Sequence, residues 1–346
     1  MTYQALVCDR LSDDLSGLSL RELERLPLGP TDVRIGIRAA GLNFPDLLMT
    51  RGEYQFKPEL PFVPGMEGAG VILETGSRVT GWQPGDAVRF GGKQGAFAEE
   101  IVVASDRLRR VRPELSMEEA ASFGTTGITA WVALNRIGRL RRGETLLVHG
   151  ARGGVGSACV QLGLHLGARV IATASNPDHL TPLVRQGAIP ISAVPGFRAK
   201  VLELTDGRGA DIIADPVGGD LFDESLRCIA WDGRLLVLGF TSGRIPSVPV
   251  NIPLIKGFSV MGVRAGEYGR RFPARGRADM KKVEDLAANG ILRPVIGASF
   301  ALHDACQAFE TLTQRRVAGK IVISVKSPTT AMHTAGLQLR DEAQSA

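Results

Sequence analysis

The 346-residue sequence is poor in the side chains that build metal and disulfide sites, with only four cysteines and five histidines. Cys8, Cys159, Cys228 and Cys306 lie far apart and form no Cys-x-x-Cys pair. A structural zinc site needs clustered ligands, so this spacing argues against one. We expect four free thiols rather than a disulfide framework, and therefore a chain that works in the cytoplasm.

Long apolar runs are also missing. No run reaches the roughly 18 residues that cross a bilayer, and Met1–Arg10 lacks the basic start and apolar block of a secretory signal. We therefore expect no membrane span. Aromatic residues make up 5% of the chain, and no basic patch is interleaved with them, so nucleic acid is not an expected partner. The net charge of +5 suits either an anionic ligand or a solvated, arginine-rich surface.

The most informative stretch of the sequence runs from Thr145 to Gly156. A short apolar run, predicted to be a strand, passes through Gly150, Gly153 and Gly154 into a segment with helical spacing. Such a turn forms an anion site, because backbone N–H groups and the helix dipole point at the ligand and no Cβ blocks its approach. A second predicted strand at 169–174 completes βαβ spacing. This pattern predicts a dinucleotide site; the alternative is a plain glycine-rich turn.

The length of the chain suits two domains. Residues before about Ser122 combine short alternating strands with Gly/Pro turns, which predicts a small, partly open barrel. Ser116 and Glu119 form a capping box that starts a helix, and strands then alternate with helices, which predicts a doubly wound parallel sheet. The predicted strands of this sheet are 145–149, 169–174, 211–215, 233–240 and 258–263, with a weaker one near Ile189, and a helix is predicted over Phe222–Ile229. Two amphipathic helices (279–288 and 303–312) and a strand (320–325) are predicted to follow.

Seven ordered segments carry a family resemblance: Gly41–Asp46, Pro64–Gly70, Thr126–Trp131, Ala151–Gly156, Asp215–Gly218, Leu238–Phe240 and Gly319–Val322. Together they resemble the medium-chain dehydrogenase/reductase superfamily, in particular its zinc-independent quinone oxidoreductase (zeta-crystallin-like) branch. The resemblance implies an α/β protein with a GroES-like β-barrel catalytic domain over 1–122 and 266–326. A Rossmann domain with a doubly wound parallel sheet would cover 123–265. It also implies a homodimer joined through the Rossmann sheets. The polar tail, 327–346, is expected to be disordered.

Zinc chemistry is not expected. The superfamily's alcohol dehydrogenases hold catalytic zinc with Cys and His ligands, and Asn43 and Met66 stand at two of those positions here. An amide and a thioether cannot replace a thiolate and an imidazole on Zn²⁺. Alcohol oxidation is therefore disfavoured. Hydride delivery to an already electrophilic carbon, as in a quinone or an α,β-unsaturated carbonyl, is favoured.

The resemblance also assigns site residues. Tyr54 is expected to hydrogen-bond the substrate carbonyl or donate a proton, with loop packing as the alternative. Asn43 is expected to position the nicotinamide or the carbonyl, with local backbone bonding as the alternative. His149 is interpreted as a packed histidine. The residues expected to bind the cofactor are Thr129, Ala151, Arg152, Gly153, Gly154, Val155, Ser175, His179, Val217, Gly239, Phe240 and Lys320.

Ser175 distinguishes the two nicotinamide cofactors. NAD sites usually carry Asp or Glu at the end of the second strand, whereas a hydroxyl there can donate to a 2′-phosphate, which favours NADPH. Relatives that use NADPH commonly add a Lys four residues on, where this chain has His179. Arg152, Arg185 and Arg198 are candidates to compensate.

Two other functions stay open. One is reduction of an enoyl-CoA (acryloyl- or crotonyl-type), with the basic segment Arg270–Arg277, Lys281 and Lys282 meeting CoA phosphates; a solvated basic surface is the alternative interpretation. The other is a non-enzymatic, nucleotide-binding or RNA-binding zeta-crystallin-like protein. Ala265 stands where relatives often carry a Trp beside the cofactor, which implies a wider pocket.

Overall fold

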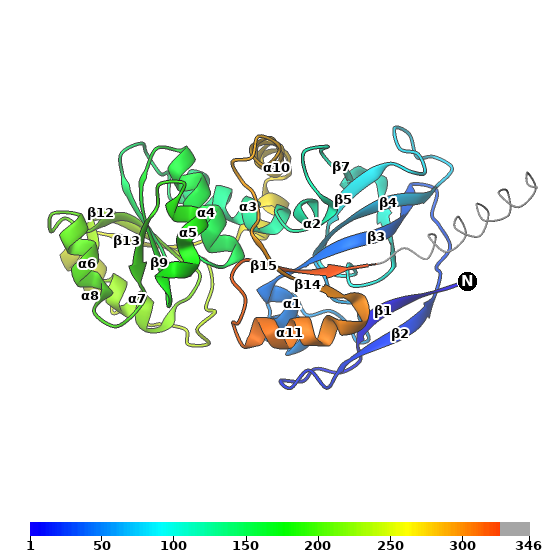
Figure 1. Ribbon diagram of the computed structural model, residues 1–346, viewed down its shortest axis with the longest axis horizontal. Helices are drawn as coiled ribbons and strands as arrows, with labels where there is room; N and C mark the ends of the chain where they lie inside the picture. Colours follow the sequence, from blue (N-terminus) through cyan, green and yellow to red (C-terminus); the bar gives the residue numbers. More distant parts are fainter. Residues whose placement is uncertain (326–346) are drawn as a thin grey trace, which may run out of the picture. The chain divides into compact units, whose positions relative to one another are not determined.

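The computed structural model describes residues 1–325, which form two compact units (Figure 1). Of the described residues, the first unit comprises Met1–Val111, Ser299–Gln314 and 321–325; the second comprises Arg112–Ala298 and Arg315–Lys320. The division expected at residues 122 and 265 differs from this one, because 112–122 and 266–298 lie with the second unit. The expected disordered tail, 327–346, lies outside the described residues.

A buried carboxylate explains why 266–298 joins the second unit. The Asp279 side chain of α10 (Pro273–Ala288) is 1% exposed. It accepts hydrogen bonds from the Trp131 indole, at the end of α3 (Gly124–Trp131), at 3.0 Å and from the Arg136 guanidinium at 2.6 Å. A buried charge has to be paired, so these contacts fix α10 against α3.

The first unit is built on antiparallel strands. Seven strands form one sheet, in the order β14-β15-β3-β4-β5-β7 with β6 on β3, and β1 pairs with β2. The strands are β1 (Thr2–Cys8), β2 (Leu18–Glu24), β3 (Asp32–Leu42), β4 (Glu67–Thr75), β5 (Ala87–Gly91), β6 (Glu100–Ala104), β7 (Arg109–Arg110), β14 (Ile296–Ala301) and β15 (Lys320–Ser324). The helices of this unit are α1 (Phe44–Thr50), η1 (Ser105–Arg107), η4 (Leu302–Asp304) and α11 (Ala305–Thr313).

The second unit contains the predicted doubly wound sheet. Six parallel strands follow the order β10-β9-β8-β11-β12-β13, which is the Rossmann order 3-2-1-4-5-6. They are β8 (Thr145–Val148), β9 (Arg169–Ala174), β10 (Ile189–Ser192), β11 (Ala210–Asp215), β12 (Ile229–Val237) and β13 (Ser259–Gly262). β8 is fully buried, and its continuous apolar run is typical of a strand covered on both faces.

The remaining helices belong to the second unit. They are α2 (Met117–Ala120), α4 (Gly154–His165), η3 (Pro177–Leu180), α5 (Thr181–Val184), α6 (Phe197–Leu204), α7 (Gly219–Ser225), α8 (Asn251–Lys256), α9 (Ala265–Arg271) and the π-helix η2 (Val132–Ile137). The predicted capping box is present at α2, where the Glu119 N–H donates to Ser116 Oγ at 3.1 Å.

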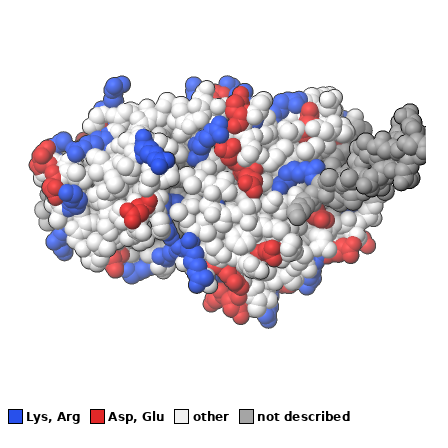
Figure 2. Space-filling model, viewed as in Figure 1, with Lys and Arg blue, Asp and Glu red and all other residues white. Residues whose placement is uncertain are grey.

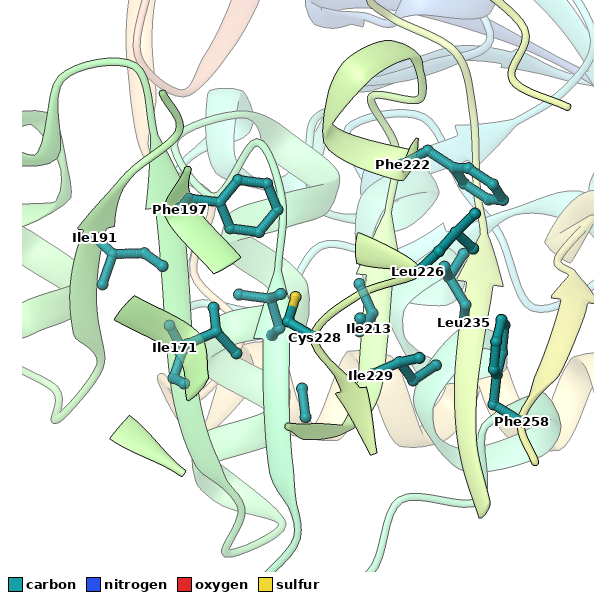
Figure 3. Packing of buried hydrophobic residues seen from close by; sticks show 13 residues of the cluster. Ile171, Ile191, Phe197, Ile213, Phe222, Leu226, Cys228, Ile229, Leu235 and Phe258 are labelled. Carbon is teal, nitrogen blue, oxygen red and sulfur yellow. The ribbon is translucent and has the colours of Figure 1, made fainter. Parts of the chain in front are cut away.

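An apolar core lies between the sheet and the helices α6 and α7 (Figure 3). Phe197 and Phe222 are each 3% exposed and project from the two helices toward strand residues such as Ile171 and Leu235. Burying one such side chain stabilises the fold by about 1.5–3 kcal/mol.

The helix predicted over Phe222–Ile229 is partly wrong. It ends at Ser225, and Ile229 already pairs with Ala210 as the first residue of β12. β12 therefore begins four residues before the predicted 233, through an irregular register at Asp232, whose φ is +60°.

The described surface carries both charges. On the face shown in Figure 2, Lys and Arg side chains alternate with Asp and Glu over the described residues. Within residues 1–325, no helix is long and apolar enough to cross a membrane.

Candidate functional site

The glycine turn between β8 and α4 is held by close backbone contacts. Gly150 has φ +58°, a conformation that glycine adopts without strain. A Cβ on Gly156 would lie 2.2 Å from the Gly150 carbonyl oxygen, so no side chain fits there. Gly156 therefore allows the helix to pack closely on the turn.

Gly153 differs from its neighbours. It is the N-cap of α4, with φ −81° and ψ 168°, an extended conformation that any residue adopts. A Cβ on Gly153 would meet nothing closer than the Gly150 carbonyl oxygen at 3.4 Å, an ordinary contact. Protein packing thus does not require glycine here. The first N–H groups of α4 have no partner within the helix and can bind an anion. A diphosphate lying against this backbone would explain the glycine.

Lys320 lies beside the same helix end. The Gly319 N–H donates to the Arg152 carbonyl at 2.7 Å, which fixes the segment 315–320 against the turn. A Cβ on Gly154 would come within 2.8 Å of Lys320 Cδ and 2.9 Å of Thr126 Cγ2. The structure therefore brings together Lys320 and the glycine turn, which lie far apart in the sequence.

Loops after β11 and β12 border the turn at the carboxyl edge of the sheet. The buried Asp215 carboxylate accepts the N–H groups of Val217 and Gly218 at 2.8 and 2.9 Å. The Thr241 N–H donates to the Pro216 carbonyl at 3.1 Å, which ties the two loops together. Val217 packs against the turn, since a Cβ on Gly150 would be 3.0 Å from Val217 Cγ2.

Gly239 and Thr129, which are also expected to bind the cofactor, lie in this unit. Gly239 approaches the loop after β11, because a Cβ there would be 3.3 Å from the Pro216 carbonyl oxygen. The Thr129 hydroxyl donates to the Thr125 carbonyl, one helical turn back in α3, at 2.7 Å. Ligands of open parallel sheets bind at the carboxyl edge that these loops form.

Ser175 follows β9 at this edge and is exposed. The Ala151 N–H donates to the Thr173 carbonyl at 3.0 Å and so holds the turn against the end of β9. Arg152 Nη1 lies 3.0 Å from His179 Nδ1. Because a guanidinium can only donate, Nδ1 accepts and the His179 proton is on Nε2. Arg152 and His179 thus form a pair of hydrogen-bond donors near Ser175.

Arg315 is a residue that the sequence analysis missed. Its carbonyl accepts a hydrogen bond from Arg152, and its guanidinium donates to the Thr241 carbonyl. The only signal in the sequence was its place just before the Gly319-Lys320 motif. The other two candidate arginines differ: among the described residues, neither Arg185 nor Arg198 makes a side-chain hydrogen bond.

The two predicted catalytic residues lie in the first unit. The Asn43 side chain is 6% exposed, and its Nδ2 donates to Glu67 Oε1 at 3.0 Å and to the Gly41 carbonyl at 3.1 Å. Asp46 accepts the backbone N–H groups of Asn43 and Gly65 at 2.8 and 3.2 Å, so it orders this loop. Tyr54 is half-buried, and its hydroxyl makes no hydrogen bond within the described residues.

The donor set around Asn43 does not fit zinc. Asn43 commits its amide to Glu67 and the Gly41 carbonyl, and the neighbouring Met66 offers only a thioether. Across residues 1–325, the structure groups no three Asp, Glu, His or Cys side chains in a way that could hold a metal ion.

His149 is buried and neutral. Ser225 Oγ donates to the Leu221 carbonyl at 2.6 Å, so it accepts from His149 Nε2 at 2.7 Å. Nδ1 then accepts from the Thr173 hydroxyl at 3.0 Å. Burial lowers the pKa of His149. The structure confirms the interpretation of a packed histidine.

Known proteins match both parts of the chain. Residues 29–113 match the family described as alcohol dehydrogenase GroES-like domain, and residues 154–289 match the family described as zinc-binding dehydrogenase. The quinone oxidoreductase-like protein 2 homolog of Nematostella vectensis is 38% identical over 330 residues, covering 94% of this chain and 90% of that protein.

Two solved structures are also similar. A quinone oxidoreductase of Pseudomonas syringae pv. tomato has a TM-score of 0.83 at 30% identity, covering 93% of this chain and 99% of its own. A mycobacterial protein solved in complex with NADPH has a TM-score of 0.83 at 28% identity, with the same coverages of 93% and 99%.

Proposed function

Because the chain belongs to the medium-chain dehydrogenase/reductase superfamily, we propose that it is an NADPH-dependent reductase that transfers hydride to a quinone or an α,β-unsaturated carbonyl without zinc. It is an oxidoreductase with a GroES-like part and a Rossmann part, and its relatives are quinone oxidoreductases. The observation that carries the proposal is Gly153, the N-cap of α4, whose extended backbone and nearest contact of 3.4 Å would accept a side chain.

NADPH, when bound, supplies the hydride. The N-terminus of α4 and Lys320 would hold its diphosphate. Ser175, Arg152 and His179 Nε2 would donate hydrogen bonds to its 2′-phosphate. The Arg152–His179 contact supports this assignment, because it places a fixed positive charge where the usual Lys is missing.

Tyr54 remains the proposed substrate-binding side chain, whereas the Asn43 amide donates to Glu67 and the Gly41 carbonyl, which supports local bonding as its role. The Tyr54 phenol would donate a hydrogen bond to the substrate oxygen as negative charge develops on it. A reduced quinone spreads that charge over its ring, whereas an enone leaves a more basic enolate. Tyr54 therefore matters more for an enone than for a quinone.

The test is oxidation of NADPH and NADH against a panel of quinones, enones and enoyl-CoAs. Tyr54→Phe should slow enone reduction by about 10²-fold or more, the usual range for general acid help, and should affect quinones less. Unchanged rates on both, with unchanged cofactor binding, would make Tyr54 a packing residue. One zinc per chain by elemental analysis, lost together with activity, would refute the metal-free chemistry.

The alternatives gain no support from the basic segment of α9 and α10. Arg270 and Arg271 both donate to Glu267, at 3.0 and 3.1 Å. Lys281 lies 3.5 Å from Asp285. These cations are partly neutralised, which disfavours a CoA phosphate site. The mixed charges of Figure 2 disfavour an RNA surface on that face.

We also propose that the chain forms a homodimer through the edge strand β13. Three apolar side chains near it are strongly exposed: Val250 (87%), Leu254 (80%) and Ile255 (68%). Exposed apolar groups beside an unpaired strand edge are typical of a subunit interface. Light scattering on the purified protein tests this, with Leu254→Glu expected to give monomers. The four cysteines are free, which suits the proposed cytoplasmic location.

A further inference from the structure

A cavity of about 200 Å³ lies within the second unit, among α3, η2, α9 and α10. Its lining residues are Ile128, Val132, Ala265, Gly266, Tyr268, Gly269, Gly276, Asp279 and Met280. Most of the lining is apolar or has no side chain, so the cavity suits an uncharged, apolar group.

The cavity and the expected cofactor site share α3 and the carboxyl edge of the sheet. Ala265 comes three residues after the end of β13, at the carboxyl edge of the sheet where the glycine turn also lies. Ile128 precedes Thr129, an expected cofactor residue, in α3. A substrate that lies at this edge would therefore meet the cavity within the same unit.

Two glycines line the cavity at positions where neither the backbone conformation nor the protein packing requires glycine. Gly266 and Gly269 lie in α9 and neither has a positive φ. A Cβ would meet nothing closer than 3.6 Å at Gly266 and 3.8 Å at Gly269. Glycine is a poor helix former compared with alanine. Gly276 is different, because its Cβ would lie 2.8 Å from the Gly269 Cα and so its absence serves helix packing.

The two polar side chains of the cavity wall, Asp279 and Tyr268, differ in their hydrogen bonding. The Asp279 carboxylate is already saturated by Trp131 and Arg136, so it offers no repulsive unpaired charge. The half-buried Tyr268 hydroxyl, in contrast, makes no hydrogen bond among the described residues. The wall therefore offers one hydroxyl to an otherwise apolar ligand.

We propose that this cavity binds a ring of the substrate, about the size of one six-membered ring, with the Tyr268 hydroxyl donating to an oxygen on or next to that ring. An apolar cavity of about 150 Å³ holds a benzene molecule, so a single ring fits in this cavity. This inference rests on the proposed function, since it names a substrate class for that reaction: quinones and enones that carry one aryl or alicyclic group.

The first experiment measures binding without catalysis. Acetophenone carries a ring and a carbonyl acceptor, and ethylbenzene carries the ring alone; both are titrated calorimetrically against the full-length protein. Ala265→Leu and Gly269→Ala should weaken binding of both probes about tenfold, because each fills part of the cavity. Tyr268→Phe should weaken acetophenone only. Gly91→Ala is the matched control, since its Cβ would meet nothing within 4 Å and lies outside the cavity.

The second experiment measures kcat/KM with NADPH for but-3-en-2-one and for 4-phenylbut-3-en-2-one. Gly269→Ala should lower the value for the phenyl substrate by about tenfold or more, the range for filling a hydrophobic pocket, and should leave the value for the small enone unchanged. Gly269→Ala should also raise the melting temperature, so misfolding would not explain the loss.

The outcomes separate the two proposals. Equal effects on both enones, or probe binding that all variants retain, would overturn the cavity assignment while leaving the reductase function intact. Probe binding that the variants lose, with no enone or quinone turned over by the wild type, would support the cavity and overturn the reaction.

Discussion

Two substitutions in one turn should have opposite consequences. Gly153→Ala places a methyl group where the nearest protein atom is 3.4 Å away, in an extended backbone that alanine accepts. Gly156→Ala places the same group 2.2 Å from the Gly150 carbonyl oxygen and 2.8 Å from the Ala151 Cα. The first change should therefore spare the fold and the second should strain it.

The magnitudes follow from these contacts. Gly153→Ala should cost at most about 1 kcal/mol of unfolding free energy, because alanine is a poorer N-cap than glycine. Gly156→Ala forces backbone to move, which typically costs about 1–3 kcal/mol, offset by about 1 kcal/mol of helix propensity. For NADPH affinity we expect the opposite order, with the larger loss for Gly153→Ala. A methyl on Gly153 would hold the diphosphate away from the α4 N–H groups, and one lost charge-assisted hydrogen bond of about 1.5–3 kcal/mol weakens binding tenfold or more.

The assay pairs urea unfolding with calorimetric titration of NADPH for the wild type and both variants. We expect near wild-type unfolding with weak NADPH binding for Gly153→Ala, and reduced stability for Gly156→Ala. If Gly153→Ala bound NADPH as the wild type does, the diphosphate would not lie on this backbone, and the interpretation of the turn as the cofactor cradle would be refuted.

Three further predictions concern Ser175, the four cysteines and His149. Ser175→Asp should weaken NADPH at least about tenfold and leave NADH unaffected in titrations, since a carboxylate repels the 2′-phosphate; equal loss of both would remove Ser175 from the phosphate site. Burial raises the pKa of Cys159 and Cys228 to about 12 and that of Cys8 to about 11. An aromatic disulfide reagent at pH 8 should therefore modify at most Cys306 in the native chain and all four thiols in urea, and rapid reaction of two native thiols would contradict this. Burial lowers the pKa of His149 below its ordinary 6.5. The unfolded chain then binds the proton first, so stability should fall as pH drops below about 6.5. His149→Gln should flatten that part of the pH profile in urea unfolding, and an unchanged slope would count against it.

Local patterns in the sequence were enough to predict the parallel sheet. Most of its strands contain a short apolar run, and the strand and helix periods alternate from residue 145 onward, which is typical of a doubly wound sheet. Element ends were less predictable. The helix after Gly219 ends at Ser225 because Ile229 pairs with Ala210, a contact that depends on a neighbouring strand rather than on local spacing.

Contacts between distant segments could not be predicted. Arg315 meets Arg152 and Thr241 only because the segment 315–320 returns to the glycine turn. The saturation of Asp279 by Trp131 and Arg136 likewise joins residues more than 140 positions apart. Neither arrangement leaves a periodic pattern in the chain, so only the folded structure shows it.

The four glycines of the turn have different structural reasons, which the sequence motif alone does not distinguish. Gly150 is required by its positive φ, Gly156 by the backbone it would strike, and Gly154 by Lys320 and Thr126. Gly150 and Gly156 would be glycine in a protein that bound nothing, whereas the contacts at Gly154 are with side-chain atoms. Only Gly153 has a permitted conformation and free space for a Cβ. A diphosphate on the α4 N–H groups is the proposed reason for glycine at that position.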